Sequence, residues 1–199
     1  MKQRNLVVVS AGLSQPSSTR LLADRLAAAT IEAGPGIEFT VTVIELRDLA
    51  HDIANHLLTG FPPAALKDAL DAVAGADALI AVTPIFTASY SGLFKSFFDV
   101  LDKDVLDGKP VLIAATAGTA RHSLALEHAL RPMFAYLHAV VVPTSVFAAS
   151  DDWGADSADG LLQSRITRAA GELAAEVERR EPVTVADPFA LTVDFKDLL

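Results

Sequence analysis

The chain has 199 residues, of which 51% are hydrophobic and 21% are charged, a composition typical of a folded protein with one sizeable core. Its 16 Lys and Arg against 25 Asp and Glu give a formal net charge of −9, which argues against general nucleic-acid binding, because such binding needs a basic surface. With no cysteine, the chain excludes disulfides, thiolate nucleophiles and cysteine-ligated zinc or iron–sulfur clusters.

Neither an export signal nor a membrane-spanning segment is expected. The apolar run Leu6–Val9 is too short for the core of a signal peptide, and no apolar run approaches the roughly 20 residues of a membrane helix. The sequence therefore predicts a cytoplasmic protein, and the absence of cysteine agrees with a reducing compartment.

Strand-like and helix-like segments alternate along the chain. The runs rich in β-branched residues, which we expect to be strands, are Leu6–Val9, Phe39–Leu46, Ala78–Val82, Val111–Ala115 and Val140–Val146. Segments with apolar residues at helical spacing lie between and after them, around residues 22–29, 92–101, 126–137 and 162–177. This alternation predicts an α/β fold, a flavodoxin-like three-layer sandwich with a five-stranded parallel sheet of order 2-1-3-4-5.

Three segments are harder to assign. Asp48–Pro63 is expected to be a long loop over part of a site or an interface. Pro132 lies inside an expected helix and deprives the His128 carbonyl of its donor, which predicts a kink or bulge there. Residues 1–180 are expected to form one domain, and the tail 181–199 is expected to dock on that domain or on a neighbouring subunit.

The loop after the first expected strand is crowded with hydroxyls where a helix begins. Ser10 ends the strand, and Ser17, Ser18 and Thr19 precede an amphipathic segment. Free N–H groups at a helix N-terminus bind anions, which favours a phosphate site over ordinary capping by Ser17 or Ser18. Gly12 stands alone, so the glycine-rich fingerprint of dinucleotide-binding folds is absent.

The loop after the third expected strand combines an aromatic residue with hydroxyls. Pro84 is expected to end the strand, and Phe86, Thr87 and Ser89 are then placed to surround a planar ligand. The alternative is a turn followed by the capped helix 92–101. In that helix we expect the three phenylalanines to be core or interface residues.

The loop after the fourth expected strand, Ala115–His122, consists largely of small residues. Small residues let the backbone approach a ligand closely, although a tight strand-to-helix turn has the same composition. The five histidines form no metal-binding pattern, so no metal site is expected.

Taken together, these loops resemble a known family. Thr83–Ser89 followed by Gly92–Lys95, and Ala117–Ala125 followed by Ala129–Pro132, are similar to segments of the NADPH-dependent FMN reductase family of flavodoxin-like proteins. Within it, the resemblance is closest to the reductases that supply reduced flavin to alkanesulfonate monooxygenases. It covers about residues 5–180.

The resemblance implies an NAD(P)H:FMN oxidoreductase that binds FMN and NADPH or NADH, forms a homodimer or tetramer, and partners a separate monooxygenase. The flavin carries the redox chemistry, so no catalytic side chain is implied. Backbone N–H groups near Gly118 and Thr119, where a helix is expected to begin, would face N1 and O2 of the flavin. The implied cofactor-binding residues are Ser10, Gln15, Ser17, Ser18, Thr19, Pro84, Ile85, Phe86, Thr87, Ser89, Thr116, Ala117, Gly118 and Thr119.

Three positions depart from the family pattern: Phe86 replaces a tyrosine, Ala117 a glycine, and Gln15 a common arginine. The loss of that arginine leaves the phosphate charge to helix N–H groups, hydroxyls and an arginine elsewhere, for which Arg20, Arg121 and Arg131 are the candidates. Other readings remain open. They are an FMN-bound quinone, azo or chromate reductase, a flavodoxin-type electron carrier, and a flavodoxin-like domain without flavin.

Overall fold

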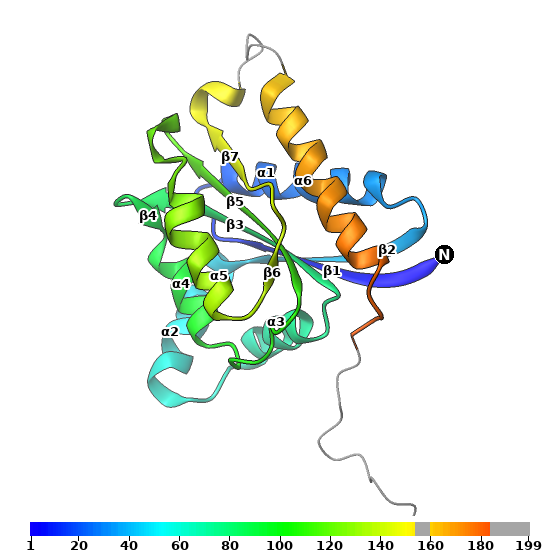
Figure 1. The fold of residues 1–199 in the computed structure, drawn as a ribbon. Coiled ribbons are helices and arrows are strands. Elements are labelled where there is room, and N and C mark those ends of the chain that lie inside the picture. Colours follow the sequence, from blue (N-terminus) through cyan, green and yellow to red (C-terminus); the bar gives the residue numbers. More distant parts are fainter. Residues whose placement is uncertain (154–159, 184–199) are drawn as a thin grey trace, which may run out of the picture.

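The computed structural model describes residues 1–153 and 160–183. Its central parallel sheet has the order β2-β1-β3-β5, with β6 and β7 both pairing with the outer side of β5 (Figure 1). The strands are Lys2–Ser10 (β1), Ile37–Glu45 (β2), Ala78–Phe86 (β3), Ser89–Tyr90 (β4), Pro110–Ala117 (β5), Val140–Val141 (β6) and Val146–Ala149 (β7). The predicted order 2-1-3-4-5 is confirmed, with the fifth position shared by two short strands.

The fifth strand predicted over Val140–Val146 is interrupted rather than continuous. Pro143 has no N–H to donate to a ladder, and side chains replace the missing strand pairing there. Arg131 donates to the carbonyls of Val142 and Pro143, and Glu172 accepts from the Thr144 N–H at 2.7 Å. These contacts satisfy the backbone where the strand breaks, so β6 and β7 form separately.

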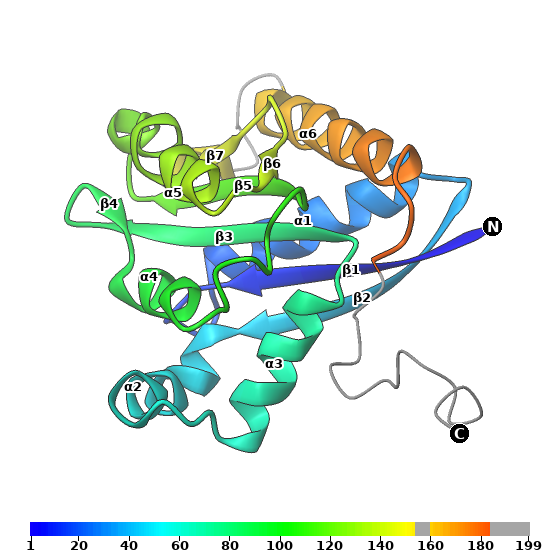
Figure 2. The same cartoon turned by 60° about the horizontal axis from the view of Figure 1, so that its bottom comes forward.

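The strand β3 runs past Pro84, so the prediction that this proline ends it is wrong. The ladder between β1 and β3 ends at the pair Ser10–Val82, so the N–H that Pro84 lacks would face a side where β1 has already ended. β3 continues to Phe86 and turns into β4, which pairs antiparallel with it. The resulting hairpin projects beyond the rest of the sheet (Figure 2).

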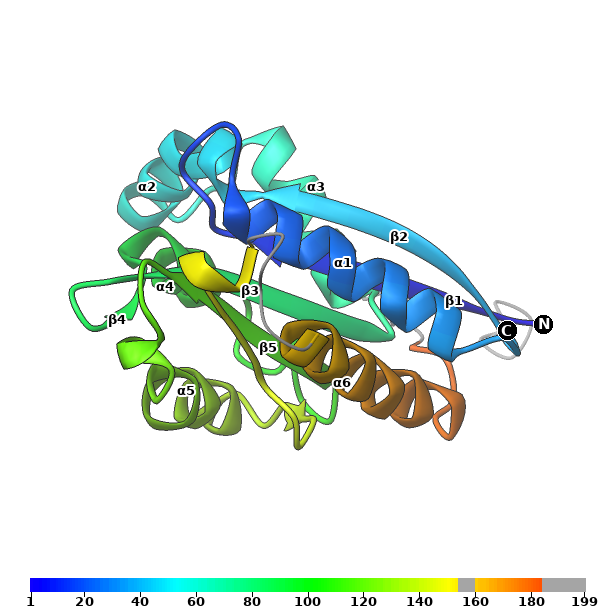
Figure 3. The same cartoon turned by 90° about the horizontal axis from the view of Figure 1, so that it is seen from above.

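Helices cover both faces of the sheet, which makes three layers. Ser18–Ala33 (α1) and Leu161–Glu178 (α6) lie side by side on one face (Figure 3). The other face is covered by four helices: Ala50–Thr59 (α2), Ala64–Ala74 (α3), Gly92–Asp99 (α4) and Arg131–Tyr136 (α5). Alternate residues of the buried strands, such as Leu6 and Val7, enter the two separate cores, as their continuous apolar runs predicted.

The phenylalanines of α4 are core residues, which confirms the core assignment over a ligand role. Phe94 and Phe97 are fully buried and Phe98 is nearly so. Phe94 and Phe98 also pack against Phe134 of α5, with ring centroids 6.3 and 5.0 Å away. This aromatic cluster holds α4 and α5 to the sheet on either side of the β3–β4 hairpin.

The segment predicted as a loop over Asp48–Pro63 is mostly helical. A 3-10 turn, Leu46–Leu49, leads directly into α2, and the helix ends at Gly60, whose φ of 74° is the left-handed value typical of a glycine C-cap. Only Ile53 of α2 is buried. With a single core residue, the helix leaves little apolar periodicity for sequence analysis to detect.

The bulge predicted from Pro132 is confirmed. The chain forms a π-turn over Leu126–Leu130 and continues as α5, with Pro132 in its first turn. His128 lies within this turn.

In the part of the chain that the structure describes, no helix combines the length and apolarity needed to cross a membrane. Of the predicted tail, residues 181–183 are described, and 184–199 lie outside the described residues. The first residues of the tail cross the edge of the sheet where β1 and β3 begin, and Val183 donates its N–H to Asp77 at 2.9 Å. Whether 1–180 is a separate domain stays a prediction.

Candidate functional site

The three loops singled out in the sequence meet at the carboxyl ends of the parallel strands. Pro84 of β3 pairs with Thr116 of β5, which in turn pairs with Ala148 of β7, so these strands end together. A pocket of about 350 Å³ opens at this edge. It is lined by Leu13, Ser14, Ser18, Thr19, Pro84, Ile85, Phe86, Thr116, Ala117, Gly118 and Ser150. We call this the carboxyl-edge pocket; it has no charged side chain in its lining.

The start of α1 offers free backbone donors to the carboxyl-edge pocket. Ser17 is the N-cap, and its hydroxyl accepts from the Arg20 N–H at 3.2 Å. This leaves the amides of Ser18 and Thr19 without a partner among the described residues, while both residues line the pocket. Ser17 is therefore a helix cap, as the alternative interpretation expected, and the free amides that could bind an anion belong to Ser18 and Thr19.

The preceding loop is pressed against this helix start. A Cβ on Gly12 would lie 2.0 Å from the Ser17 hydroxyl oxygen, so any larger residue there would have to displace the hydroxyl that caps α1. Ser10 is 1% exposed at the end of β1, and its hydroxyl has no hydrogen-bond partner among the described residues. Buried hydroxyls are normally hydrogen-bonded, so the Ser10 hydroxyl is a candidate to bind a ligand at this strand end.

A hydroxyl pair ties two of the loops together. The buried hydroxyls of Thr19 on α1 and Thr116 at the end of β5 lie 2.8 Å apart. This contact joins segments 97 residues apart in sequence, and both residues were among those implied by the family resemblance.

From the β3–β4 hairpin, Pro84, Ile85 and Phe86 line the carboxyl-edge pocket, and Phe86 is 47% exposed. The predicted ligand hydroxyls of Thr87 and Ser89 are not part of the lining. Thr87 and the next residue form the tight turn, with φ values of 48° and 66° that non-glycine residues rarely adopt. Thr87 and Ser89 thus belong to the turn and the returning strand of the hairpin, beyond the three residues that line the pocket.

From β5, Thr116, Ala117 and Gly118 line the pocket, and Thr119 does not. A Cβ on Gly118 would meet no atom within 4 Å, so the space in front of it is open. The helix expected after this loop is a single 3-10 turn, Ala120–His122, whose N-cap Thr119 makes no side-chain cap bond. One short turn has little dipole, so the predicted helix terminus at Gly118 and Thr119 is corrected to a short turn.

Three further predicted residues, Ser10, Gln15 and Ser17, lie outside the lining, and three lining residues were missed. Gln15 is exposed, Ser17 caps α1, and Ser10 is buried at the end of β1. Leu13 and Ser14 belong to the first loop but were not singled out. Ser150 follows β7, and the rule that ligands bind at carboxyl strand ends would have found it if applied to the fifth strand.

The three arginines proposed for a phosphate have different surroundings. Arg20 donates to Asp24 and to Glu45, and these carboxylates raise the pKa of its guanidinium, most through the hydrogen bond to Asp24. Arg131 is held by Glu127 and two backbone carbonyls. Arg121 makes no hydrogen bond or ion pair with another residue of the described ranges.

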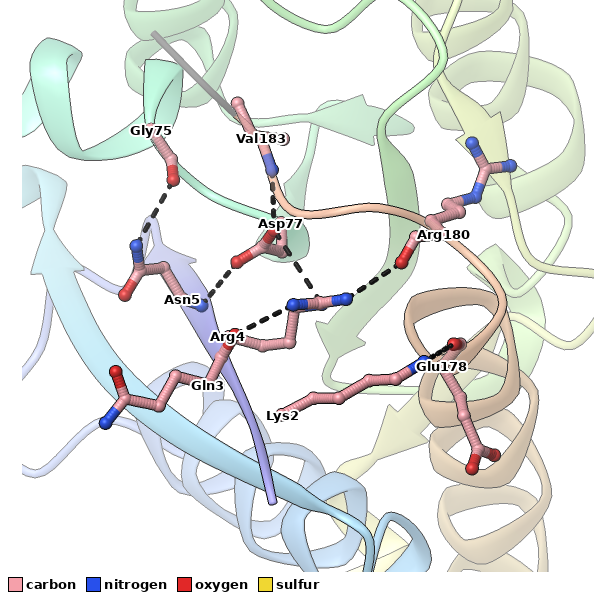
Figure 4. A network of polar contacts seen from close by, with 9 residues as sticks. All are labelled: Lys2, Gln3, Arg4, Asn5, Gly75, Asp77, Glu178, Arg180 and Val183. Atoms are coloured by element: carbon pink, nitrogen blue, oxygen red, sulfur yellow. Dashed lines mark hydrogen bonds and ion pairs between the residues drawn. The ribbon is translucent and has the colours of Figure 1, made fainter.

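A larger cavity, of about 590 Å³, lies at the opposite edge, where the strands begin. Here Arg4 and Asp77 are buried 4.0 Å apart, and Asp77 accepts from the Asn5 N–H at 2.7 Å. Arg4 also donates to the carbonyl of Arg180 at 2.8 Å (Figure 4). We call this group the amino-edge network.

Comparison with known proteins places the chain in a family. The model of the NADPH-dependent FMN reductase family matches residues 4–154. The FMN reductase (NADPH) of Pseudomonas aeruginosa is 40% identical over 148 residues, covering 74% of this chain and 78% of the relative. The NADH-dependent FMN reductase SfnE of Pseudomonas putida is 37% identical, covering 86% of this chain and 89% of the relative.

A solved structure agrees with these relatives. An oxidoreductase from Corynebacterium diphtheriae superposes with a TM-score of 0.87 at 47% sequence identity, covering 91% of this chain and all of that one. Family model, relatives and fold point the same way: the chain belongs to the NADPH-dependent FMN reductase family.

Proposed function

We propose that this chain transfers hydride from a reduced nicotinamide dinucleotide to FMN, and that FMN lies in the carboxyl-edge pocket. The observation that carries the proposal is the pairing, in one pocket, of free helix N-terminal amides with an apolar strand end. The volume of about 350 Å³ falls in the range of small-molecule sites, and the pocket lies where open α/β sheets bind ligands.

The phosphate end of FMN fits the start of α1. The free amides of Ser18 and Thr19, together with the positive end of the helix dipole, favour binding of an anionic group. The Ser18 hydroxyl adds a donor. Ser10, which ends β1 just before this loop, has a hydroxyl with no partner among the described residues. Since Arg20 is occupied by two carboxylates, neutral donors hold the phosphate, which agrees with the missing arginine at position 15.

The ring end of FMN fits the wall formed by Pro84, Ile85, Phe86 and Gly118. This wall is apolar, and the open space in front of Gly118 admits a flat group close to the backbone. FMN, when bound, supplies the hydride-accepting centre. The chain's part is to orient the flavin, and Phe86 of the wall is 47% exposed, so this side of the site borders solvent, from which a second ligand can approach.

The activity is tested by following the oxidation of NADPH and NADH by the purified protein with and without added FMN. We expect oxidation that depends on flavin. No oxidation of either nucleotide in the presence of FMN would contradict the proposal. Oxidation that requires a quinone while FMN stays bound would instead indicate a reductase with a second acceptor substrate.

We also propose that the chain forms a homodimer or tetramer through the end of α2. Leu57, Leu58 and Phe61 are 51%, 87% and 81% exposed, and they follow one another closely around the C-terminal end of the helix. Grouped exposed apolar residues of this size commonly form subunit contacts. Light scattering of Leu58→Glu should show smaller particles than the wild type, and an unchanged mass would contradict this surface.

We propose, finally, that the reduced FMN serves a separate monooxygenase in the cytoplasm. The support is the resemblance to reductases of that group and the absence of cysteine, which suits a reducing compartment. The test is product formation by a purified flavin-dependent monooxygenase supplied with this chain, FMN and reduced nucleotide. Failure of that reaction, when chemically reduced FMN supports it, would contradict the partnership.

A further inference from the structure

A second, cationic pocket adjoins the carboxyl-edge pocket. It has a volume of about 350 Å³. We call it the arginine pocket; its lining includes Ala88, Arg121, His122, Leu124, His128 and Ala129. The lining of this pocket contains no carboxylate, although the whole chain carries a net charge of −9.

The linings of the two pockets come from the same two chain segments. Phe86 lines the carboxyl-edge pocket, and Ala88, two residues along the same hairpin, lines the arginine pocket. Gly118 and Arg121, three residues apart, are divided between the two pockets in the same way. Consecutive Cα atoms are about 3.8 Å apart, so the linings come within roughly 8–11 Å of each other. One extended ligand can therefore reach both.

Arg121 is available to such a ligand, unlike the other two candidate arginines. Arg20 and Arg131 are each bound to carboxylates, whereas Arg121 is exposed and has no partner in the described part of the chain. The nearest acidic residue in sequence, Glu127, is not part of the lining, and it accepts hydrogen bonds from Arg131 and Ser145 at 3.0 and 2.8 Å. The hydrogen bond from Arg131 lowers the pKa of Glu127, so its charge stays with Arg131.

We propose that the arginine pocket binds the 2′-phosphate of NADPH, so that this chain prefers NADPH to NADH. A phosphate monoester is nearly a dianion, and a guanidinium beside two imidazoles on an apolar floor suits it better than the singly charged groups of a pyrophosphate. Recognition of NADH uses a carboxylate on the ribose 2′-hydroxyl, and the lining holds none. This inference rests on the proposed function, because it assigns the remote end of the same cosubstrate.

The test uses Arg121→Gln, with Arg168→Gln as the matched control. Arg168 is also exposed and has no ion pair within the described residues, but it lies on α6 at the other face of the sheet. Both variants remove one positive charge, so a general effect of net charge would appear in both. Because both side chains lie at the surface, we expect the fold and the melting temperature to be retained.

The first readout is binding alone, by calorimetry with adenosine 2′,5′-bisphosphate and with AMP. We expect Arg121→Gln to weaken binding of the bisphosphate by about 10- to 100-fold, the usual loss of a charge-assisted hydrogen bond, and to leave AMP binding unchanged. Equal binding of the two probes by the wild type would overturn the proposal. So would an Arg121→Gln protein that binds the bisphosphate like the wild type.

The second readout is turnover with FMN. In Arg121→Gln the KM for NADPH should rise by about tenfold or more, while the KM for NADH and the affinity for FMN stay as in the wild type. Equal losses for both nucleotides would assign the pocket to the pyrophosphate and overturn the proposal, as would a matching loss in Arg168→Gln. If the wild type fails to oxidise either nucleotide, the proposed function fails, and the binding readout still decides the phosphate site.

Discussion

The two edges of the sheet both carry a cavity, and they differ in how their polar groups are used. At the amino edge, Arg4, Asp77 and Lys109 are buried and hydrogen-bonded to neighbouring groups. At the carboxyl edge, the amides of Ser18 and Thr19 have no partner among the described residues. The larger cavity, about 590 Å³ against about 350 Å³, thus belongs to the edge where these three charged groups are hydrogen-bonded, and where the buried Nε of Arg180 has no partner within the described residues.

The two cavities therefore differ in what borders them: charged groups that hold chain segments together at the amino edge, and free helix N-terminal amides at the carboxyl edge. The three buried charged groups Arg4, Asp77 and Lys109 hold chain segments together. Lys109 donates to the last carbonyls of α3, Asp77 accepts from the Val183 N–H, and Arg4 donates to the Arg180 carbonyl. We therefore expect substitutions at the amino edge to change stability and those at the carboxyl edge to change ligand affinity.

The largest effect is expected from Lys109→Met at the amino edge. Burial lowers the pKa of Lys109 to about 8 from an ordinary value of 10.5. Between these values the unfolded chain binds more protons than the folded one, so the unfolding free energy of the wild type rises with pH by about 3 kcal/mol in total. Lys109→Met lacks this rise, because methionine does not titrate.

The measurement is denaturant unfolding of both proteins between pH 7 and 10.5. The unfolding free energy of the wild type minus that of Lys109→Met should be constant below pH 8 and should increase from there to pH 10.5. Other titrating groups are common to both proteins and cancel in the difference. A difference that does not vary with pH would contradict the assignment of Lys109 as a buried cation. FMN affinity at pH 7 should be equal in the two proteins.

The next largest effect is expected from Gly118→Leu at the carboxyl edge. Because a Cβ there meets no atom within 4 Å, the fold accepts the side chain, which then occupies the pocket. We expect FMN affinity to fall by about 100-fold, or about 2.7 kcal/mol, with the melting temperature unchanged. Flavin fluorescence titration measures this. Gly92→Leu is the control, since Gly92 is exposed at the start of α4 and has equally open space; a similar loss of affinity there would contradict the pocket assignment.

The amino edge was also the part of the molecule that the sequence predicted least. Buried strands such as Leu6–Val9 are visible as continuous apolar runs, and the carboxyl-edge loops follow from the rule about strand ends. Lys109 and Arg4 carry no comparable signal. Charged residues are usually exposed, and only the tertiary fold shows that these two are buried and paired.

At the carboxyl edge, the sequence predicted which loops form the pocket better than which of their side chains line it. Ser17 and Ser18 are alike in the sequence, yet one caps α1 and the other lines the pocket. Thr87 and Ser89 were expected at the ligand, but a tight turn with positive φ angles at a threonine and an alanine has no sequence signature. The bulge predicted near His128 is present as a π-turn. It was predictable because proline has no N–H to donate to a carbonyl of the preceding turn, whatever the fold around it.

The smallest effect separates the two serines. Ser17→Ala removes the cap and should lower the unfolding free energy by about 1 kcal/mol, with FMN affinity near the wild-type value. Ser18→Ala should leave stability unchanged and weaken FMN binding several-fold, by about 0.5–1.5 kcal/mol for one lost hydrogen bond. Thermal unfolding and flavin titration of both variants measure this. If the two variants behave alike, capping and ligand binding are not divided between these residues as described.

The most direct test of the central claim is an NMR titration of the isotopically labelled protein with FMN, read at the backbone amides. We predict that the amide resonances of Ser18, Thr19 and Gly118 at the carboxyl edge shift, with those of Arg4, Asp77 and Lys109 at the amino edge unmoved. Shifts concentrated on Arg4, Asp77 and Lys109, with Ser18 and Thr19 unmoved, would contradict the placement of the flavin.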